Sequence, residues 1–148
     1  MHLRSTMAVA GLAFGVAFAG YALAQPATER MNPLLQPSPL PYGVPRFDQL
    51  RNEDFRAALD QGMREELADV QRIADDPAPP TFANTMEALE KSGALLRGTQ
   101  RTFNVLLGAH SDDVLQKIDA EYSPKLAAHR DVIDLNPRLF TRVKSLHD

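Results

Sequence analysis

Histidines and paired carboxylates are the residues with the most chemical potential in this chain. The four histidines stand at positions 2, 110, 129 and 147. The last three are followed by Ser, Arg or Asp and never by Glu, so the H-E-x-x-H zinc motif is absent. A spatial cluster of His110, His129 and His147 is the alternative, but a histidine on an apolar stripe, as His129 is, more often packs with a hydrogen-bonded ring. We therefore predict no catalytic residue and no metal ligand in residues 1–148.

The acidic pairs have a simpler explanation than catalysis. Glu65-Glu66, Asp75-Asp76 and Asp112-Asp113 are adjacent in sequence, so on a helix their side chains point in different directions. Neither a G-x-S-x-G, a P-loop nor a G-x-G-x-x-G motif occurs. The absence of cysteine excludes disulfides, thiolate zinc ligands and a cysteine nucleophile. The formal net charge of −3 also argues against a nucleic-acid partner.

The first 24 residues have the composition of a targeting segment. "MHLRSTMAVAGLAFGVAFAGYALA" has a basic start, an apolar stretch and small residues at Ala22 and Ala24. This A-x-A pattern predicts a signal peptide over residues 1–24, cleaved before Gln25, and therefore an exported, periplasmic protein. The alternative is an uncleaved anchor, although a stretch rich in Ala and Gly would insert weakly. After cleavage we expect no stable membrane association and a monomer.

Residues 25–51 are predicted to form an extended arm. Six of the eleven prolines lie in this stretch, and proline excludes both a helix interior and a central strand. A solvated linker is the simpler alternative. Because the stretch also contains Leu34, Leu35, Tyr42 and Phe47, we expect it to lie across a helical body.

Helical periodicity dominates residues 52–148. A first helix is expected from the N-cap Asn52 to Asp75, with Gly62 marking the close approach of a neighbour. A second is expected from the N-cap Thr81 to residue 110, as one helix of about 40 Å whose heptad pattern predicts an antiparallel partner. Asn84 stands where a full capping box would have Glu or Gln.

The remaining segment predicts two further helices. One begins near Ser111-Asp112 and contains Pro124, which should kink or divide it. The other begins at Asn136-Pro137, an N-cap followed by proline, and reaches Asp148 without a terminating signal. The sequence therefore predicts an all-α fold of antiparallel helical hairpins that is truncated at its C-terminal end.

Three stretches carry a more specific resemblance. "NPLLQPSPLPYGVPRFDQLRNEDFRAALDQGM" (32–63), "PTFANTMEALEKSGALL" (80–96) and "SPKLAAHRDVIDLNPRLFTRVKSLHD" (123–148) resemble the N-terminal region of bacterial peptidyl-dipeptidases. These enzymes belong to the thimet oligopeptidase family of zinc metallopeptidases. The resemblance covers nearly all of residues 25–148, in order. It implies a larger, helical metallopeptidase in which residues 52–148 are the N-terminal helical region.

The resemblance also implies a function for the parent protein. Such enzymes hold zinc through H-E-x-x-H and a downstream Glu, and release C-terminal dipeptides from short peptides. None of those ligands has a counterpart here, so we expect this chain to bind no zinc, to be inactive alone and to supply channel-wall helices. Oligopeptide substrates would bind through the missing catalytic region. The alternative is a free-standing periplasmic helical module that binds peptides or proteins.

Overall fold

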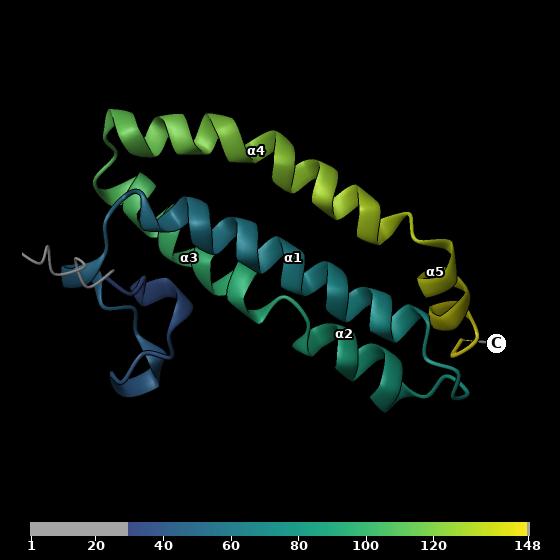
Figure 1. The fold of residues 1–148 in the computed structure, drawn as a ribbon. Coiled ribbons are helices and arrows are strands. Elements are labelled where there is room, and N and C mark those ends of the chain that lie inside the picture. The colour runs from purple at the N-terminus through teal and green to yellow at the C-terminus, as the bar shows by residue number, and fades with distance from the viewer. Residues whose placement is uncertain (1–29, 148) are drawn as a thin grey trace, which may run out of the picture.

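Helices make up all the regular structure of the described part of the chain. The computed structural model describes residues 30–147, and within that range it contains no strand (Figure 1). The elements, in order, are the short turns η1 (Pro33–Leu35), η2 (Pro41–Gly43) and η3 (Phe47–Gln49), then α1 (Asp54–Ala74), the π-helical turn η4 (Ala83–Glu87), α2 (Ala88–Lys91), α3 (Ala94–Ala109), α4 (Asp113–Asp134) and α5 (Pro137–Lys144). The predicted all-α fold is confirmed.

Helix α1 lies in the middle of the molecule and contacts every other α-helix. Figure 1 shows α3 antiparallel to α1 on one side of it. On the other side, α4 runs parallel to α1. The main core lies where these three helices meet, with the Phe55 and Phe103 rings edge to face at 5.1 Å between centroids. The buried side chains of this core are Phe55, Leu59, Leu96, Phe103, Leu115, Ile118 and Tyr122.

The close approach predicted at Gly62 is confirmed. A Cβ atom at this position would lie 2.8 Å from Cα and 2.9 Å from N of Leu96, both of them backbone atoms of α3. A carbon–carbon contact normally needs about 3.5–4.0 Å. Only glycine therefore lets α1 and α3 pack at this distance.

The helix expected over residues 81–110 is broken, so that prediction is wrong. Ser92 is extended and Gly93 has a φ of 65°, in the left-handed region that glycine tolerates best. A Cβ at Gly93 would collide with the Glu66 side chain, and the Arg97 guanidinium donates to the carbonyls of Glu90 and Ser92 at the break. The break leaves room for Glu66 and satisfies carbonyls that the end of α2 exposes.

The start of the second helical segment has a reciprocal cap. Thr81 Oγ1 accepts from the Asn84 backbone N–H at 3.1 Å, and Asn84 Oδ1 accepts from the Thr81 N–H at 2.7 Å. The N-cap prediction at Thr81 is confirmed, and Asn84 completes the box in place of Glu or Gln. The following turn is π-helical, which alters the register, and Phe82 at the start of the expected seam is 68% exposed.

The start of α1 also differs from expectation. Asn52 does not cap the helix; its side-chain amide instead donates to Asp112 Oδ2 at 2.7 Å. The carboxylate of Asp54 accepts the Arg51 N–H, and it also pairs with Arg30. The prediction of an Asn52 cap is wrong because this amide joins the starts of α1 and α4.

Helices α4 and α5 begin where the sequence predicts, near Asp112 and at the N-cap Asn136. Asp112 accepts from the N–H groups of Val114 and Leu115, and Asn136 accepts from those of Arg138 and Leu139. Of the two outcomes predicted at Pro124, a kink or a division of the helix, the division does not occur, since α4 is continuous. Pro124 lies on an exposed part of α4, where the carbonyl that loses its partner can bind water.

Residues 30–51 lie across α1 and α3. The Arg30 guanidinium binds Asp54 and the Gln49 carbonyl, and Asn32 donates to the Asp54 carbonyl at 2.8 Å. Leu34 and Leu50 pack on the main core. Among the described residues, no helix combines the length and the apolar character needed to cross a membrane.

Candidate functional site

The structure separates the three histidines of the described region. His129 is buried on α4, whereas His110 follows the end of α3 and His147 follows α5, both exposed. The ends of α3 and α5 lie at opposite ends of the molecule (Figure 1). Within residues 30–147, no three His, Cys, Asp or Glu side chains come together in an arrangement that could hold a metal ion.

His129 forms a buried pair with an acidic residue of α1. Its Nε2 lies 2.7 Å from Oε2 of Glu66, and the side chains are 6% and 17% exposed. The interpretation of His129 as a hydrogen-bonded packing residue is confirmed. The pair lies at one side of a space of about 260 Å³ between α3 and α4. Because each partner satisfies the other, the pair stabilises the packing of α4 on α1.

Arg142 is a buried cation that the sequence analysis did not single out. Its guanidinium donates to the Asp76 carboxylate at 3.0 Å and to the carbonyls of Asp76 and Ala78 at 2.8 and 3.1 Å. Its Nε donates to Thr85 Oγ1, also buried, at 3.1 Å. Through these hydrogen bonds Arg142 joins α5 to the loop after α1 and to η4. One signal could have indicated it: Arg142 lies three residues after Leu139, on the apolar stripe of α5.

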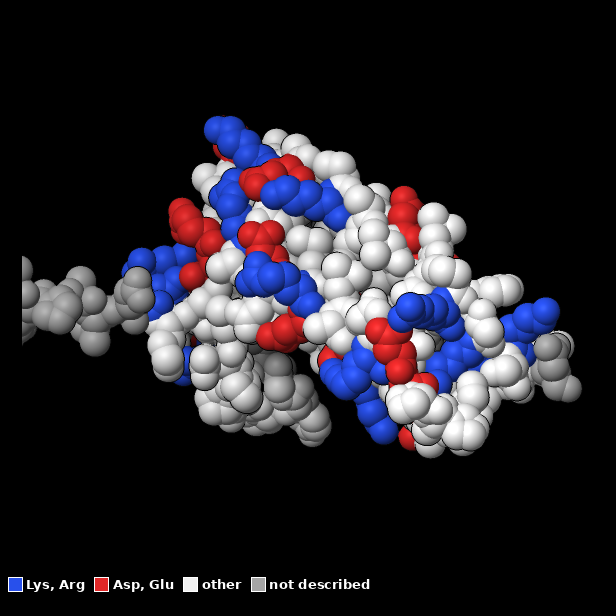
Figure 2. Space-filling model, turned by 45° about the vertical axis from the view of Figure 1, so that its right-hand side comes forward, with Lys and Arg blue, Asp and Glu red and all other residues white. Residues whose placement is uncertain are grey.

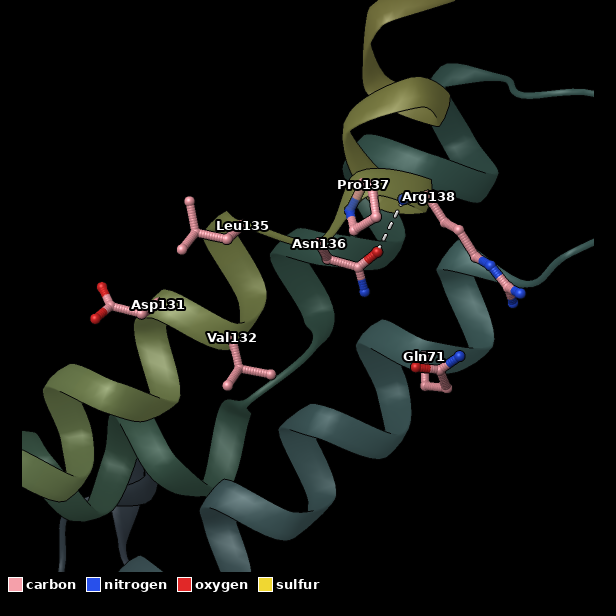
Figure 3. Close-up of a pocket in the computed structure, with 7 residues that line it drawn as sticks. All are labelled: Gln71, Asp131, Val132, Leu135, Asn136, Pro137 and Arg138. Carbon is pink, nitrogen blue, oxygen red and sulfur yellow. Dashed lines mark hydrogen bonds between the residues drawn. The ribbon is translucent and has the colours of Figure 1, made fainter.

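A depression on the described surface lies where α4 turns into α5. It has a volume of about 470 Å³, and Figure 3 shows the residues around it, which come from α1, the end of α4 and the start of α5. They are Gln71, Asp131, Val132, Leu135, Asn136, Pro137 and Arg138. Leu135 is 78% exposed and Val132 is also exposed. The depression thus combines uncovered apolar side chains with one acid and one base at its edge.

Further apolar side chains are exposed on η4 and α5. Phe82 and Met86 stand beside Glu87, Glu90 and Lys91 around a second shallow depression. Phe140 on α5 is exposed as well. Figure 2 shows acidic and basic side chains interspersed on one face with uncharged surface between them. That face therefore carries charges of both signs.

The shifted acid–base groups of the described region have structural causes. The pKa of Asp75 is lowered by hydrogen bonds from Gln71 and then Arg138, and that of Asp112 by the Leu115 N–H and then the Asn52 amide. Burial, with the Asp60 carboxylate, raises the pKa of Tyr122 to about 12. Each of these groups lies at a helix end or in the core, so none indicates a catalytic acid or base.

Predicted site residues at the N-terminus cannot be placed. Ala22, Ala24 and Gln25, where signal cleavage is predicted, lie outside the described residues. The cleavage therefore stays a prediction. The structure adds Glu66 as the partner of His129, the Arg142 cluster and the α4–α5 depression.

Comparison with known proteins identifies relatives of the chain. It is 44% identical over 115 residues to a dipeptidyl carboxypeptidase of Salmonella typhimurium, and 43% identical over 116 residues to one of Escherichia coli. Each alignment covers 78% of this chain and 17% of the relative, so the chain spans about a sixth of the length of these proteins. No protein-family model matches the chain. This similarity relates the chain to the bacterial dipeptidyl carboxypeptidases, as a counterpart of their N-terminal region.

Proposed function

We propose that this chain is the N-terminal helical region of an exported peptidyl-dipeptidase, a zinc metallopeptidase that releases C-terminal dipeptides from short peptides. The observation that carries the proposal is the 43–44% identity to dipeptidyl carboxypeptidases over 78% of the chain. Those relatives are much longer, since the aligned region is 17% of their length. The catalytic groups of the parent protein would then lie outside residues 1–148.

In this proposal the chain is architectural. Zinc bound elsewhere in the parent would lower the pKa of an attacking water and polarise the scissile carbonyl. The residues of this chain would form part of a channel wall that admits short peptides and excludes folded proteins. Three features suit such a wall: the α1–α3 contact at Gly62, the His129–Glu66 pair and the Arg142 cluster each fix one helix against another.

The exposed apolar side chains support a packing role toward the remainder of the parent protein. Val132 and Leu135 at the α4–α5 depression and Phe140 on α5 would otherwise remain in water. Burying an apolar side chain of this size contributes about 1.5–3 kcal/mol. We propose that helices of the parent outside this chain cover these residues, with Asp131 and Arg138 at the rim of that contact.

The intact mass of the native protein, measured in extracts of its own cells, tests the proposal. A mass far above 16.3 kDa, with this sequence at its front, is the expected result. A mass matching residues 25–148 would support signal cleavage before Gln25 but would overturn the parent enzyme. The alternative of a free-standing periplasmic binding module would then replace it.

A peptidase assay on the purified 148-residue chain provides the second test. We expect no release of dipeptides from short peptides and no stoichiometric binding of zinc, because the chain lacks the H-E-x-x-H motif. Hydrolysis that a chelator abolishes would contradict the assignment of catalysis to a missing region. A trace of contaminating peptidase is recognised by assaying a preparation from cells that lack the gene.

A further inference from the structure

The proline-rich segment contains a strained turn at Tyr42. Residues 41–44 form a two-residue turn that is closed by a hydrogen bond from the Val44 N–H to the Pro41 carbonyl at 3.3 Å. Both residues inside the turn lie in the left-handed region, Tyr42 with a φ of 58° and Gly43 with a φ of 67°. Within residues 30–147, Tyr42 is the only residue other than glycine with a positive φ.

A turn of this type favours residues other than tyrosine. Two consecutive left-handed residues are normally Asn-Gly, Asp-Gly or Gly-Gly, because a short polar side chain, or none, tolerates the crowding of Cβ against the backbone. Gly43 fits this pattern and Tyr42 does not. The tyrosine therefore costs conformational free energy at a position where an asparagine would cost less. A strained residue of this kind points to a function of its side chain.

The Tyr42 side chain has no packing role within the described fold. It is 104% exposed, which means that essentially all of its surface faces water. Leu40 and Val44, two residues before and after it, are also exposed, at 42% and 44%. A tyrosine buries about 150–250 Å² where it packs against protein. These three residues, called the arm tip below, thus leave a large apolar area uncovered.

Hydrogen bonds and prolines hold the arm tip in one conformation. Ser38 donates its hydroxyl to the Val44 carbonyl and accepts from the Leu40 N–H, so it joins the two sides of the turn. The backbone on both sides is restricted by prolines at positions 39, 41 and 45. An aromatic side chain on a fixed backbone loses little freedom on binding, and aromatic residues are common anchors of protein interfaces. The arm tip therefore has the construction of a docking element.

The length of the relatives indicates which partner covers the arm tip. The aligned region is 17% of each relative, so most of such a protein lies outside it and must pack somewhere on this region. Figure 1 shows residues 30–51 at the end of the molecule opposite α5. A parent protein that contacted only the α4–α5 end would leave the strained, exposed ring of Tyr42 in water. Contact at both ends accounts for the ring and for the strain.

We propose that the arm tip is a second docking element for the remainder of the parent protein, with the Tyr42 ring as its anchor. This inference rests on the proposed function, since it requires a parent longer than residues 1–148. The surface that receives the ring is apolar, because Leu40 and Val44 enter with it, and it offers a hydrogen-bond partner to the phenol, as buried tyrosines usually have. Burial of the ring then offsets the strain of the turn.

Nitration of Tyr42 by tetranitromethane measures whether the arm tip is covered. Mass spectrometry follows the peptide that contains Tyr42 in the purified 148-residue chain and in the long protein from its own cells, at equal concentrations. Tyr42 should react in the 148-residue chain about as fast as N-acetyl-tyrosinamide added as an internal control, because the ring is exposed. In the long protein it should react at least about tenfold more slowly, because a docked ring reacts only when the contact opens. Tyr122, which is 2% exposed, should resist in both proteins.

Tyr42→Asn separates a docking ring from one that only strains the turn. Asparagine suits the left-handed position, so in the 148-residue chain the amides of residues 40–44 should exchange with solvent more slowly than before. In the long protein the same amides should exchange about tenfold faster, because the anchor is lost. Tyr42→Phe keeps both the ring and the strain, so it should retain most of the protection in the long protein.

Four results would overturn the inference. Equal nitration of Tyr42 in the two proteins, with the long protein present in the cells, does so and leaves the proposed function intact. Slower exchange of residues 40–44 in both proteins on Tyr42→Asn does so as well, because the ring then has no partner. A native mass matching residues 25–148 overturns the proposed function together with the inference. Protection of Tyr42 that develops in the 148-residue chain as its concentration rises indicates a second copy as the occupant instead.

Discussion

Replacing Gly62 with alanine tests whether the contact between α1 and α3 determines the stability of the chain. The added Cβ would lie 2.8 Å from Leu96 Cα and 2.9 Å from Leu96 N. Both atoms are backbone, so no side-chain rotation relieves the collision. The two helices must separate by about 1 Å to restore an ordinary contact.

The size of the effect follows from two opposing contributions. Overpacking of a tight contact costs about 1–3 kcal/mol, because the helices separate where Leu59 and Leu96 pack in the main core. Alanine is a better helix former than glycine by about 1 kcal/mol, which offsets part of this cost. We expect Gly62→Ala to lower the free energy of unfolding by up to about 2 kcal/mol, and the unfolding temperature by up to about 8 °C.

Urea unfolding followed by far-ultraviolet circular dichroism measures this difference. Gly98→Ala is the matched control, since Gly98 lies within α3 and a Cβ there meets no heavy atom within 4 Å. The control should gain stability by up to about 1 kcal/mol from helix propensity alone. Gly108, near the end of α3, offers a second open position.

The decisive result is that Gly62→Ala lowers the free energy of unfolding whereas Gly98→Ala raises it. If Gly62→Ala and Gly98→Ala both stabilised the chain by similar amounts, the backbone contact at Leu96 would not limit the packing of α1 on α3. The close approach would then be incidental, and the role given to Gly62 would be wrong. A lower unfolding cooperativity in Gly62→Ala alone would instead agree with loosened helix packing.

Substitutions at three further positions test one helix cap and two buried polar groups. Arg142→Met should lower the free energy of unfolding by about 2–3 kcal/mol in urea titrations, because it leaves the Asp76 and Ala78 carbonyls without their donor. Arg142→Lys keeps the charge but not the fork of donors, so it should lose less stability than Arg142→Met and still be less stable than the unsubstituted chain. Asn136→Ala should cost about 1 kcal/mol in the same assay, through loss of two N-cap hydrogen bonds. The neutral Tyr122 phenol is favoured by folding, since its pKa rises from 10.0 to about 12. Its contribution of about 2–3 kcal/mol should therefore be full below pH 10 and lost as the pH rises through 12. Tyr122→Phe should remove this alkaline loss when stability is measured against pH.

The pKa of Asp112 links stability to acid in the opposite direction. Because hydrogen bonds lower the pKa of Asp112, the stability that this group contributes is present above the ordinary value of 3.8 and is lost as the pH falls through the folded value.

Helix caps formed between neighbouring residues are a feature that the sequence predicts well. The caps at Thr81 and Asn136 involve residues within a few positions of each other, and propensity alone indicates them. The return bond from the Thr81 N–H to Asn84 was not predicted, because Glu or Gln usually stands at that position.

Features that depend on distant residues were harder to predict. The break at Gly93 is not encoded by the heptad pattern around it; it depends on Glu66 of α1, whose side chain occupies the space that a Cβ would need. Asn52 has the side chain of a good N-cap, but a partner sixty residues away, Asp112, binds its amide instead. Tertiary contacts override local propensity at both positions.

Different interactions stabilise the two ends of the molecule: apolar burial at one end and polar contacts at the other. The main core has seven buried apolar side chains and lies toward the start of α1, whereas the cluster toward α5 has three: Val70, Ile73 and Leu139. The polar contacts of Arg142 compensate for that thinner core. The exposed Leu135 and Phe140 lie at this same end, and a partner surface that covered them would add the apolar burial that the three-residue cluster lacks. This distribution is why we propose that the α4–α5 end is where the rest of a peptidyl-dipeptidase packs against the chain.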